Sequence, residues 1–456
     1  MAFDAATNHL RQKLRGELLA PADTGYDEAR RIFNAMIDRH PALIVRCAHT
    51  DDVAAAVRFA REHSLPVSVK GAGHNVAGNA VCDHGVMIDC SGMKRIEVDT
   101  ANRIAKAQPG PTLGEFDKAT TAQGLFTTMG VVSKTGIAGL TLGGGLGWLM
   151  GKFGLACDNL MAAEVVTAEG KVVRASAEEN ADLLWGLRGG GGNFGIVTRF
   201  DYRLHPVEPV IGGLVLHPLG RAIELLRFYR ELIANCPDPL TLYVAIQNGP
   251  DGTPVCGIAA GYCGEPAGGE GLLAPIRAFG SPIADMIAPV SYVQQQSMID
   301  DFYTAGFSYY WRSAMLDTLS DEAMDVLLEY FQRRPSPLTQ MFFEHMHGAA
   351  SRVPPADTAF AHRSNQLNFS ALGIWRESKE TDANLAWMHE FWRDLRPHLA
   401  RRAYVNYLGQ EGAERVREAY GPNYERLVAL KTKYDPTNFF RFNQNIQPAP
   451  SAACAG

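Results

Sequence analysis

The chain has 456 residues, 46% of them hydrophobic and 20% charged, and a formal net charge of −6 at pH 7. This length exceeds the usual size of a single hydrophobic core, so we expect two lobes. A weakly acidic chain without basic clusters argues against nucleic acid as a partner, and no apolar run is long enough to predict a membrane span.

The N-terminal residues lack the apolar block of a secretion signal, which predicts a cytoplasmic protein. The eight cysteines include no Cys-x-x-Cys pair, so neither a disulfide framework nor a zinc or iron–sulfur centre is predicted. We expect a small molecule as the ligand.

The first predicted elements lead into a histidine flanked by glycines. Residues 50–64 carry apolar side chains at helical spacing, and 66–70 predict a buried strand. The turn at 71–78 follows, and its glycines allow backbone N–H groups to approach a pyrophosphate. His74 lies inside this turn, where its imidazole can contact a cofactor. Further strands are predicted at 86–88 and 96–98, and a helix at 112–123.

Glycine is dense between residues 130 and 195, above all at 136–145. A glycine inside regular structure costs roughly 0.5–1 kcal/mol, so this run predicts close approach to a ligand and not one continuous helix. Interleaved leucine, isoleucine and tryptophan side chains argue against a mobile linker. A lone thiol, Cys157, follows in a second glycine-led turn at 154–159.

Two nucleotide-binding motifs are matched in spacing but not in context. Residues 190–195 have the spacing of a dinucleotide fingerprint, yet they follow an apparent helix at 181–187 and precede a β-branched run at 196–198. The fingerprint requires strand, turn and helix in that order. Gly151-Lys152 resembles the end of a P-loop but lacks its first glycine and its Ser or Thr. Neither a Rossmann site nor an NTPase is predicted.

Beyond Pro206 the pattern changes to alternating strands, such as 214–216 and 241–246. Helices are predicted at 220–235 and 320–333. This order indicates a second lobe in which helices cover a sheet.

The segments 71–78 and 152–159 together resemble the FAD-binding domain of the vanillyl-alcohol oxidase and p-cresol methylhydroxylase (PCMH) superfamily, in its berberine-bridge-enzyme-like branch. The resemblance runs from about Pro41 to Pro206 and returns from Tyr404 to Ile446. It implies a two-lobed α+β fold of the PCMH type, whose second lobe is an antiparallel sheet covered by helices. The expected domains are a PCMH-type FAD-binding domain at 1–206, a substrate domain at 207–403 and a C-terminal berberine-bridge-like segment at 404–456 that returns to the FAD lobe.

In that branch the histidine matching His74 bonds the 8α carbon of the flavin and the cysteine matching Cys157 bonds C6, which implies FAD attached twice. Attachment through His74 alone is the alternative, because some members have another residue at the cysteine position. The remaining cofactor-binding residues expected from the resemblance are Lys70, Gly71, Ala72, Gly73, Asn75, Gly136, Gly139, Thr141, Gly144, Asp158, Asn159, Ile196, Val197 and Asn443.

The motif Tyr404-Val405-Asn406-Tyr407 is similar to the Tyr-x-Asn-Tyr element of the family, in which the second tyrosine faces the substrate. The expected catalytic residues are therefore Tyr407 as the base, with Tyr404 and Asn406 as positioning residues. A tyrosine has an ordinary pKa of about 10, so it acts as a base near neutral pH only where a cation or hydrogen-bond donor favours the phenolate. Otherwise Tyr407 is a packed strand residue.

These features predict an FAD-dependent oxidoreductase that removes hydride from a carbon next to oxygen or nitrogen and transfers it to flavin N5. A sugar, an alkaloid-like amine or a secondary metabolite is the expected substrate. Ile137 falls where the family controls access of oxygen to the flavin, so the electron acceptor is either O2 or another oxidant. The alternatives are a ligand-sequestering flavoprotein of the drug-binding resistance type and a glycine-rich scaffold.

The segment Glu344-His345-Met346-His347 raises the question of a metal site, because residues i and i+2 share one face of a strand. His362 is the available third histidine, and its position cannot be inferred from the sequence. A catalytic metal would also be redundant beside a flavin. We therefore predict no metal and favour a polar contribution to the substrate pocket.

Overall fold

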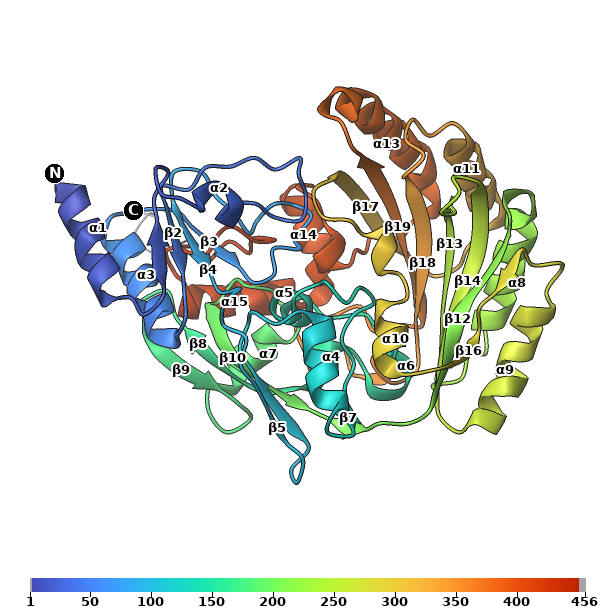
Figure 1. The fold of residues 1–456 in the computed structure, drawn as a ribbon, viewed down its shortest axis with the longest axis horizontal. Helices are drawn as coiled ribbons and strands as arrows, with labels where there is room; N and C mark the ends of the chain where they lie inside the picture. The colour runs from blue at the N-terminus through green and yellow to red at the C-terminus, as the bar shows by residue number, and fades with distance from the viewer. Residues whose placement is uncertain (1, 451–456) are drawn as a thin grey trace.

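A computed structural model describes residues 2–450 of the chain and has two lobes (Figure 1). One lobe contains the beginning and the end of the described chain, and the other is a broad sheet with helices on its outer face (Figure 1). The expected α+β class, with an antiparallel sheet covered by helices in the second lobe, is confirmed. Residues 451–456 of the expected C-terminal segment lie outside the described residues.

The first lobe begins with a four-stranded sheet of order β1-β2-β4-β3, in which β2, β4 and β3 are parallel. Parallel strands need a crossover connection. The predicted helix at 50–64 forms the connection from β2 to β3 and buries Val53 and Val57. The elements are β1 (Glu17–Leu19), α2 (Tyr26–Ala29), β2 (Leu43–Arg46), α3 (Thr50–Glu62), β3 (Val67–Lys70) and β4 (Val86–Asp89), with α1 (Ala2–Lys13) beside α3.

A second, antiparallel sheet of order β5-β6-β10-β8-β9 completes this lobe. The glycine-rich run forms only a short helix, α5, followed by a loop of three glycines at 143–145. Residues 190–195 join α7 to β10, so the helix-to-strand order expected there is confirmed. The elements are β5 (Ile96–Asp99), β6 (Ile104–Ala107), α4 (Leu113–Thr121), β7 (Leu125–Phe126), α5 (Ile137–Leu142), α6 (Met150–Phe153), β8 (Leu160–Val166), β9 (Val172–Ala175), α7 (Ala181–Leu187), β10 (Ile196–Arg203) and β11 (His205–Pro206), which pairs with β7.

The second lobe is one antiparallel sheet of order β15-β12-β14-β13-β18-β19-β17, with β16 also paired to β12. Helices α8, α9, α11 and α13 bury one face in a core of its own, and the other face lies towards the first lobe (Figure 1). The strands are β12 (Val210–Pro218), β13 (Leu240–Asn248), β14 (Pro254–Cys263), β15 (Ala284–Asp285), β16 (Ala288–Val290), β17 (Ser308–Leu316), β18 (Gln340–Met346) and β19 (Gln366–Trp375). The helices are α8 (Ala222–Ile233), α9 (Pro266–Ala278), α10 (Tyr292–Ser297), α11 (Asp321–Gln332), α12 (Ala349–Arg352) and α13 (Thr381–Leu395).

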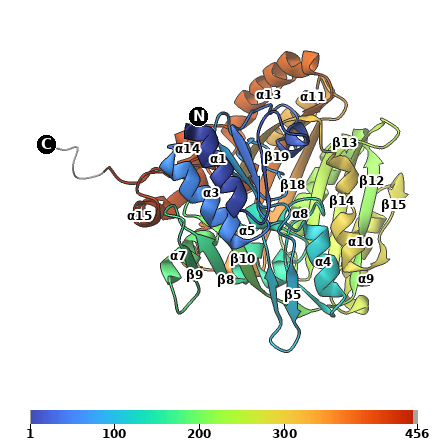
Figure 2. The same cartoon turned by 60° about the vertical axis from the view of Figure 1, so that its left-hand side comes forward.

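The C-terminal helices return to the first lobe. Helices α14 (Ala413–Tyr420) and α15 (Tyr424–Tyr434) bury Val416, Leu427 and Leu430 in the core that also contains the side chains of β8 and β10. Figure 2 shows these helices on the same side of the molecule as α1 and α3. The chain therefore closes the first lobe with segments from both of its ends.

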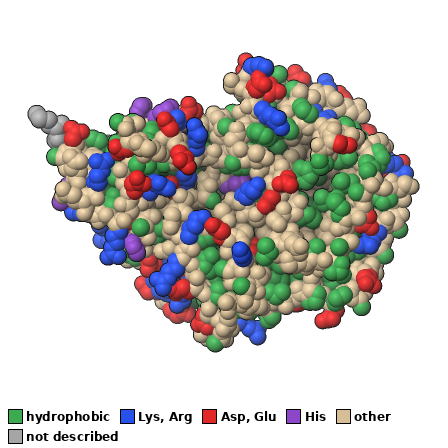
Figure 3. Space-filling model, viewed as in Figure 1, with side chains coloured by type: hydrophobic (Ala, Val, Ile, Leu, Met, Phe, Trp, Pro, Cys, Tyr) green, Lys and Arg blue, Asp and Glu red, His purple; other side chains and the backbone are tan. Residues whose placement is uncertain are grey.

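The surface in Figure 3 carries acidic and basic side chains interspersed with one another, while hydrophobic side chains gather over the second lobe. Among the described residues, no helix combines the length and the apolar character needed to cross a membrane.

Candidate functional site

Two adjoining cavities meet at the turn after β3. The first spans about 1030 Å³, including space open to solvent, and is lined by the first lobe and the C-terminal segment. The second spans about 1000 Å³ in the same sense and extends to β17 and β18 of the second lobe. Because both are lined by Gly71, Asn75, Gly139 and Asn406, they form one continuous space.

Most of the residues predicted from the sequence line this space. Those on its walls are Gly71, Ala72, Gly73, His74, Asn75, Gly136, Gly139, Ile196, Val197, Tyr404, Asn406, Tyr407 and Asn443. Those that do not line it are Lys70, Thr141, Gly144, Cys157, Asp158 and Asn159.

Glycine suits its positions on the cavity walls for two different reasons. A Cβ at Gly136 would lie 2.8 Å from the Cβ of Ala72, so the two predicted turns touch there. A Cβ at Gly139 or Gly192 would meet no atom within 4 Å. These two backbones therefore face open space in the cavity, as a site for a flat cofactor with a pyrophosphate requires.

Asn443 provides a polar group on the same wall. Its Nδ2 donates to the carbonyl oxygens of Gly192, at 3.2 Å, and Phe440, at 3.0 Å. Its Oδ1 is buried without a hydrogen-bond partner among the described residues. A buried unpaired acceptor is costly, so this oxygen suits an N–H donor of a ligand.

His74 is held against the cavity by aromatic stacking. Its ring stacks on Phe33 with centroids 4.0 Å apart, and Phe33 stacks in turn on Tyr309 of β17 at 4.4 Å. The Nε2 atom of His74 is buried and has no hydrogen-bond partner among the described residues. Burial lowers the pKa of His74 to about 4, so its imidazole is neutral and keeps a free lone pair near pH 7. Phe33 was not among the residues predicted from the sequence.

Three predicted cofactor residues instead support the turns from behind. Lys70 donates to the carbonyl oxygen of Ala29 at 2.8 Å and lies 3.5 Å from a carboxylate oxygen of Asp89. The hydroxyl of Thr141 is hydrogen-bonded to that of Tyr202 at 2.8 Å in the core. A Cβ at Gly144 would lie 2.9 Å from the ring of Phe360, so this glycine is needed for packing.

Cys157 lies next to the glycine loop. Its backbone N–H donates to the carbonyl oxygen of Gly144 at 2.8 Å, and its side chain is fully buried in the apolar cluster that also contains the cavity residue Tyr404. Burial raises the pKa of its thiol, which disfavours the nucleophilic thiolate. Arg363 binds both carboxylate oxygens of Asp158, at 2.8 and 2.7 Å, and Asn159 donates to two carbonyl oxygens of the same turn region. The turn that contains the thiol is therefore held by several hydrogen bonds.

Tyr404 and Asn406 position the glycine-rich loop. The hydroxyl oxygen of Tyr404 accepts hydrogen bonds from the backbone N–H of Gly145 and from Nδ2 of Asn406, both at 2.8 Å. Asn406 Nδ2 also donates to the carbonyl oxygen of Leu140 at 3.0 Å. Both side chains therefore hold the glycine-rich loop in place.

Tyr407 faces a carboxylate and not a cation. Its hydroxyl donates to Oε1 of Glu344 at 3.1 Å, and Oε2 of Glu344 accepts from Nδ2 of Asn368 at 2.7 Å. Glu344 is 1% exposed, and burial raises its pKa to about 7. Burial and the charge of Glu344 raise the pKa of Tyr407 well above its usual value, which opposes formation of a phenolate. In the sequence, Glu344 stands out only as a neighbour of two histidines.

A third cavity of about 650 Å³ opens beside this pair. It shares Val131, Tyr303 and Phe342 with the wall near His74, so the two spaces adjoin. Its other walls are largely apolar, and its polar side chains include Gln247, Gln340 and Glu344. Ile137, expected to control oxygen access, is fully buried in the core of the first lobe and lines none of the three cavities.

Comparison with known proteins agrees with this arrangement. Residues 41–176 match the family model described as an FAD binding domain, and residues 403–447 match the model described as berberine and berberine like. The chain is 31% identical to (R)-6-hydroxynicotine oxidase of Paenarthrobacter nicotinovorans, over 96% of this chain and 98% of that one.

Two solved structures are similar over nearly their whole length. The 6-hydroxy-D-nicotine oxidase of Arthrobacter nicotinovorans matches with a TM-score of 0.88 and 28% identity, over 95% of this chain and 98% of that one. Glucooligosaccharide oxidase of Acremonium strictum, which carries a 6-S-cysteinyl, 8α-N1-histidyl FAD, matches with a TM-score of 0.87 and 25% identity, over 97% and 99%. Since the likeness extends over both lobes and the cavity between them, the chain belongs to the berberine-bridge-enzyme-like family of FAD-linked oxidoreductases and is a PCMH-type enzyme that uses FAD.

Proposed function

We propose that FAD is attached to this chain through His74 and Cys157, with attachment through His74 alone as the alternative. The neutral imidazole of His74 lies on the cavity wall with an unpartnered Nε2, and Cys157 belongs to the apolar cluster that includes the cavity residues Leu146 and Tyr404. Glucooligosaccharide oxidase, a structural neighbour, carries an FAD attached through both a cysteine and a histidine. The glycine backbones at 139 and 192 and the free oxygen of Asn443 would hold the rest of the cofactor.

The attachment can be tested by the mass of the denatured protein. We expect wild type, Cys157→Ala and His74→Ala each to retain one FAD after denaturation, and the double variant His74→Ala, Cys157→Ala to release it. Release of the flavin from wild-type protein would contradict covalent attachment. Release from His74→Ala, with retention by Cys157→Ala, would leave attachment through His74 alone.

For the reaction, we propose that Glu344 accepts a proton from the substrate and that Tyr407 positions the donor group. The observation that carries this proposal is the 3.1 Å hydrogen bond from Tyr407 to Glu344, on the wall where the FAD cavity meets the apolar one. Bound FAD supplies the acceptor for the hydride. A carboxyl group whose pKa is about 7 is well matched to proton transfer near neutral pH.

The walls beside Glu344 favour a compact, largely apolar substrate with one amine or hydroxyl group. The aromatic rings of Tyr243, Phe302, Tyr303 and Phe342 line this space. An oligosaccharide would need many hydrogen-bond partners for its hydroxyl groups, because buried polar groups without partners are costly. A protonated amine instead finds a single carboxylate and aromatic faces, which suit a cation. The related 6-hydroxynicotine oxidase acts on a compound of this kind.

Anaerobic bleaching of the flavin distinguishes these substrate classes. We expect cyclic or aromatic amines and alcohols to reduce the flavin, and gluco-oligosaccharides and xylo-oligosaccharides to leave it oxidised. Faster reduction by an oligosaccharide than by any amine or alcohol would contradict the proposed class. Binding of ligands without reduction by any of them would favour the sequestering alternative.

A further inference from the structure

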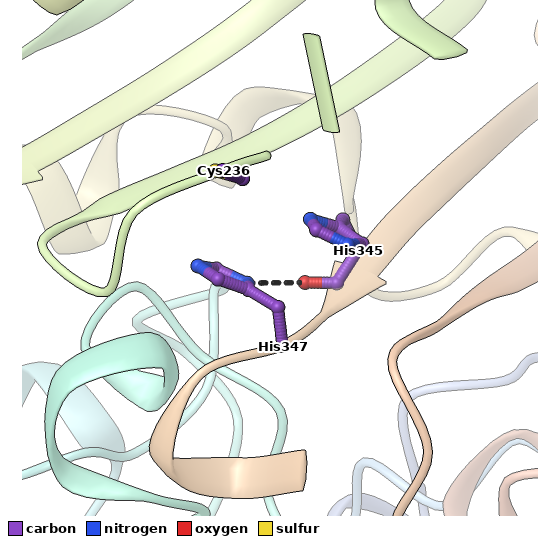
Figure 4. A group of neighbouring side chains, drawn as sticks. All are labelled: Cys236, His345 and His347. Atoms are coloured by element: carbon purple, nitrogen blue, oxygen red, sulfur yellow. Dashed lines mark hydrogen bonds between the residues drawn. The ribbon is translucent and has the colours of Figure 1, made fainter. Parts of the chain in front are cut away.

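A second group of chemically reactive side chains lies in the other lobe, on the side of β18 away from Glu344. His345 is near the end of β18 and His347 follows it, while Cys236 lies just after α8 (Figure 4). One ligand atom of each residue lies within 4.8 Å of the other two. His362, the third histidine considered from the sequence, is elsewhere, because its ring is hydrogen-bonded to the carbonyl oxygen of Glu418 at 2.9 Å. The third group is a thiol that the sequence did not single out.

Hydrogen bonds fix one nitrogen of each imidazole and leave the other free. Nε2 of His345 lies 2.6 Å from Oδ1 of Asn365, and Nδ1 of His347 lies 3.2 Å from the carbonyl oxygen of His345 (Figure 4). Both partners are acceptors, so each of these nitrogens carries the ring proton. The remaining atoms, Nδ1 of His345 and Nε2 of His347, are buried and have no hydrogen-bond partner among the described residues. Metal-binding histidines typically use one ring nitrogen for such a hydrogen bond and the other for the metal.

We propose that Cys236, His345 and His347 bind one Zn²⁺ ion, with water in the fourth position. Thiolate and imidazole are the ligands that Zn²⁺ prefers, and three protein ligands leave one tetrahedral position open. Binding forms one Zn–S and two Zn–N bonds. The thiol of Cys236 releases its proton to solvent, and both imidazoles stay neutral.

The ligand atoms must move closer together when the ion binds. Zn–S and Zn–N bonds of about 2.3 and 2.0 Å place tetrahedral ligand atoms about 3.5 Å apart. The two imidazole planes are within 4° of parallel, with centroids 4.6 Å apart, so one ring must rotate for both lone pairs to meet at one ion. Cys236 is only partly buried, and its thiol now donates to the carbonyl oxygen of Leu240 at 3.1 Å. Release of this weak hydrogen bond lets the sulfur turn towards the histidines.

The ion would join segments that meet at the boundary between the lobes. A Cβ at Gly151 of α6 would lie 2.6 Å from Nε2 of His347, so the first lobe packs against this imidazole. Two residues after Cys236, Asp238 forms an ion pair with Arg352 of α12. A bound Zn²⁺ would therefore stabilise the turn after α8 against β18 and the adjoining lobe.

Metal analysis of the flavin-containing full-length protein tests this proposal. The protein is treated with a chelator, dialysed against Zn²⁺ of known free concentration, and analysed for zinc per flavin. We expect one zinc per chain for wild type and for the control Cys263→Ser, a buried thiol of β14 outside the cluster. Cys236→Ser and His347→Gln should each bind at least about tenfold more weakly.

Replacement of Zn²⁺ by Co²⁺ gives an independent readout. We expect a charge-transfer band from thiolate to Co²⁺ in wild type and its loss in Cys236→Ser, with the flavin content unchanged in both. Absence of stoichiometric zinc from wild type would overturn the proposal. Equal zinc binding by wild type, Cys236→Ser and His347→Gln would overturn it as well, because the ion would then lie elsewhere.

Discussion

Replacing Glu344 with glutamine tests whether a carboxylate in the apolar cavity accepts the substrate proton. Glutamine has nearly the same shape, and its Oε1 can still accept the hydrogen bond from Asn368 that now spans 2.7 Å. It cannot accept a proton as a base, so flavin reduction should slow by about 10²–10⁴, or about 3–5 kcal/mol of barrier. The wild-type rate should rise with pH to a plateau above about 7, where Glu344 is ionised, and the variant should lack this rise.

The same substitution should have the opposite effect on folding stability. Burial raises the pKa of Glu344 from 4.5 to about 7, so between these values the folded chain binds a proton that the unfolded chain releases. This contribution to stability is fully present below about 4.5 and is lost as the pH rises through 7. At about 1.4 kcal/mol per pH unit, the ionised carboxylate costs the fold about 3 kcal/mol. Glu344→Gln should match wild type near pH 4.5 and be more stable by up to about 3 kcal/mol at about pH 8.

The rate of flavin reduction is measured by anaerobic stopped-flow, with a substrate found by the bleaching assay. The free energy of unfolding is measured with denaturant at the two pH values. Reduction of Glu344→Gln at the wild-type rate would refute the base. A wild-type rate that does not change across the pH range would refute the titration of Glu344 near 7. If the variant gains no stability at the higher pH, the carboxylate is not desolvated as the buried geometry requires.

Two further substitutions test other parts of the site, and a third tests the buried ion pair between Lys431 and Asp435 in the C-terminal segment. Tyr407→Phe removes the hydroxyl that donates to Glu344, so flavin reduction should slow while the flavin content, measured by absorbance, stays at the wild-type value. Gly139→Val places a branched side chain where a Cβ now meets open space, so the purified protein should contain little flavin; full loading would show that the cofactor does not pass this wall. Lys431→Met leaves Asp435 as an unpaired buried charge and should cost about 3–5 kcal/mol, seen as a lower denaturation midpoint, whereas the exposed control Lys433→Met should change it little.

The cofactor half of the site could be predicted because short local patterns determine it. His74 lies in a glycine turn directly after strand β3, so its side chain can contact a ligand bound at that turn. Gly136 must be glycine because it packs against Ala72. Cys157 has an equally clear local pattern, but its surroundings depend on other segments. The loop at 143–145 is hydrogen-bonded to its backbone, and the neighbouring Asp158 is bound by Arg363, 205 residues further along the chain. The motif therefore predicts the turn, whereas the surroundings of its thiol depend on long-range packing.

Glu344, the proton acceptor that we propose, was not predicted from the sequence, for a related reason. Successive side chains of a strand face opposite sides of the sheet, so Glu344 and His345 must diverge, and the sequence alone does not tell which of them faces the flavin lobe. The answer depends on Tyr407, 63 residues further along the chain, whose hydroxyl reaches Glu344, and on helices that cover the other face. Once that side is known, our two proposals place different chemistry on the two faces of β18. Glu344 faces the cavities, whereas His345 of the strand and His347 after it lie near the thiol of Cys236 on the side of the helices. A metal ion bound there would be separated from the flavin by the sheet.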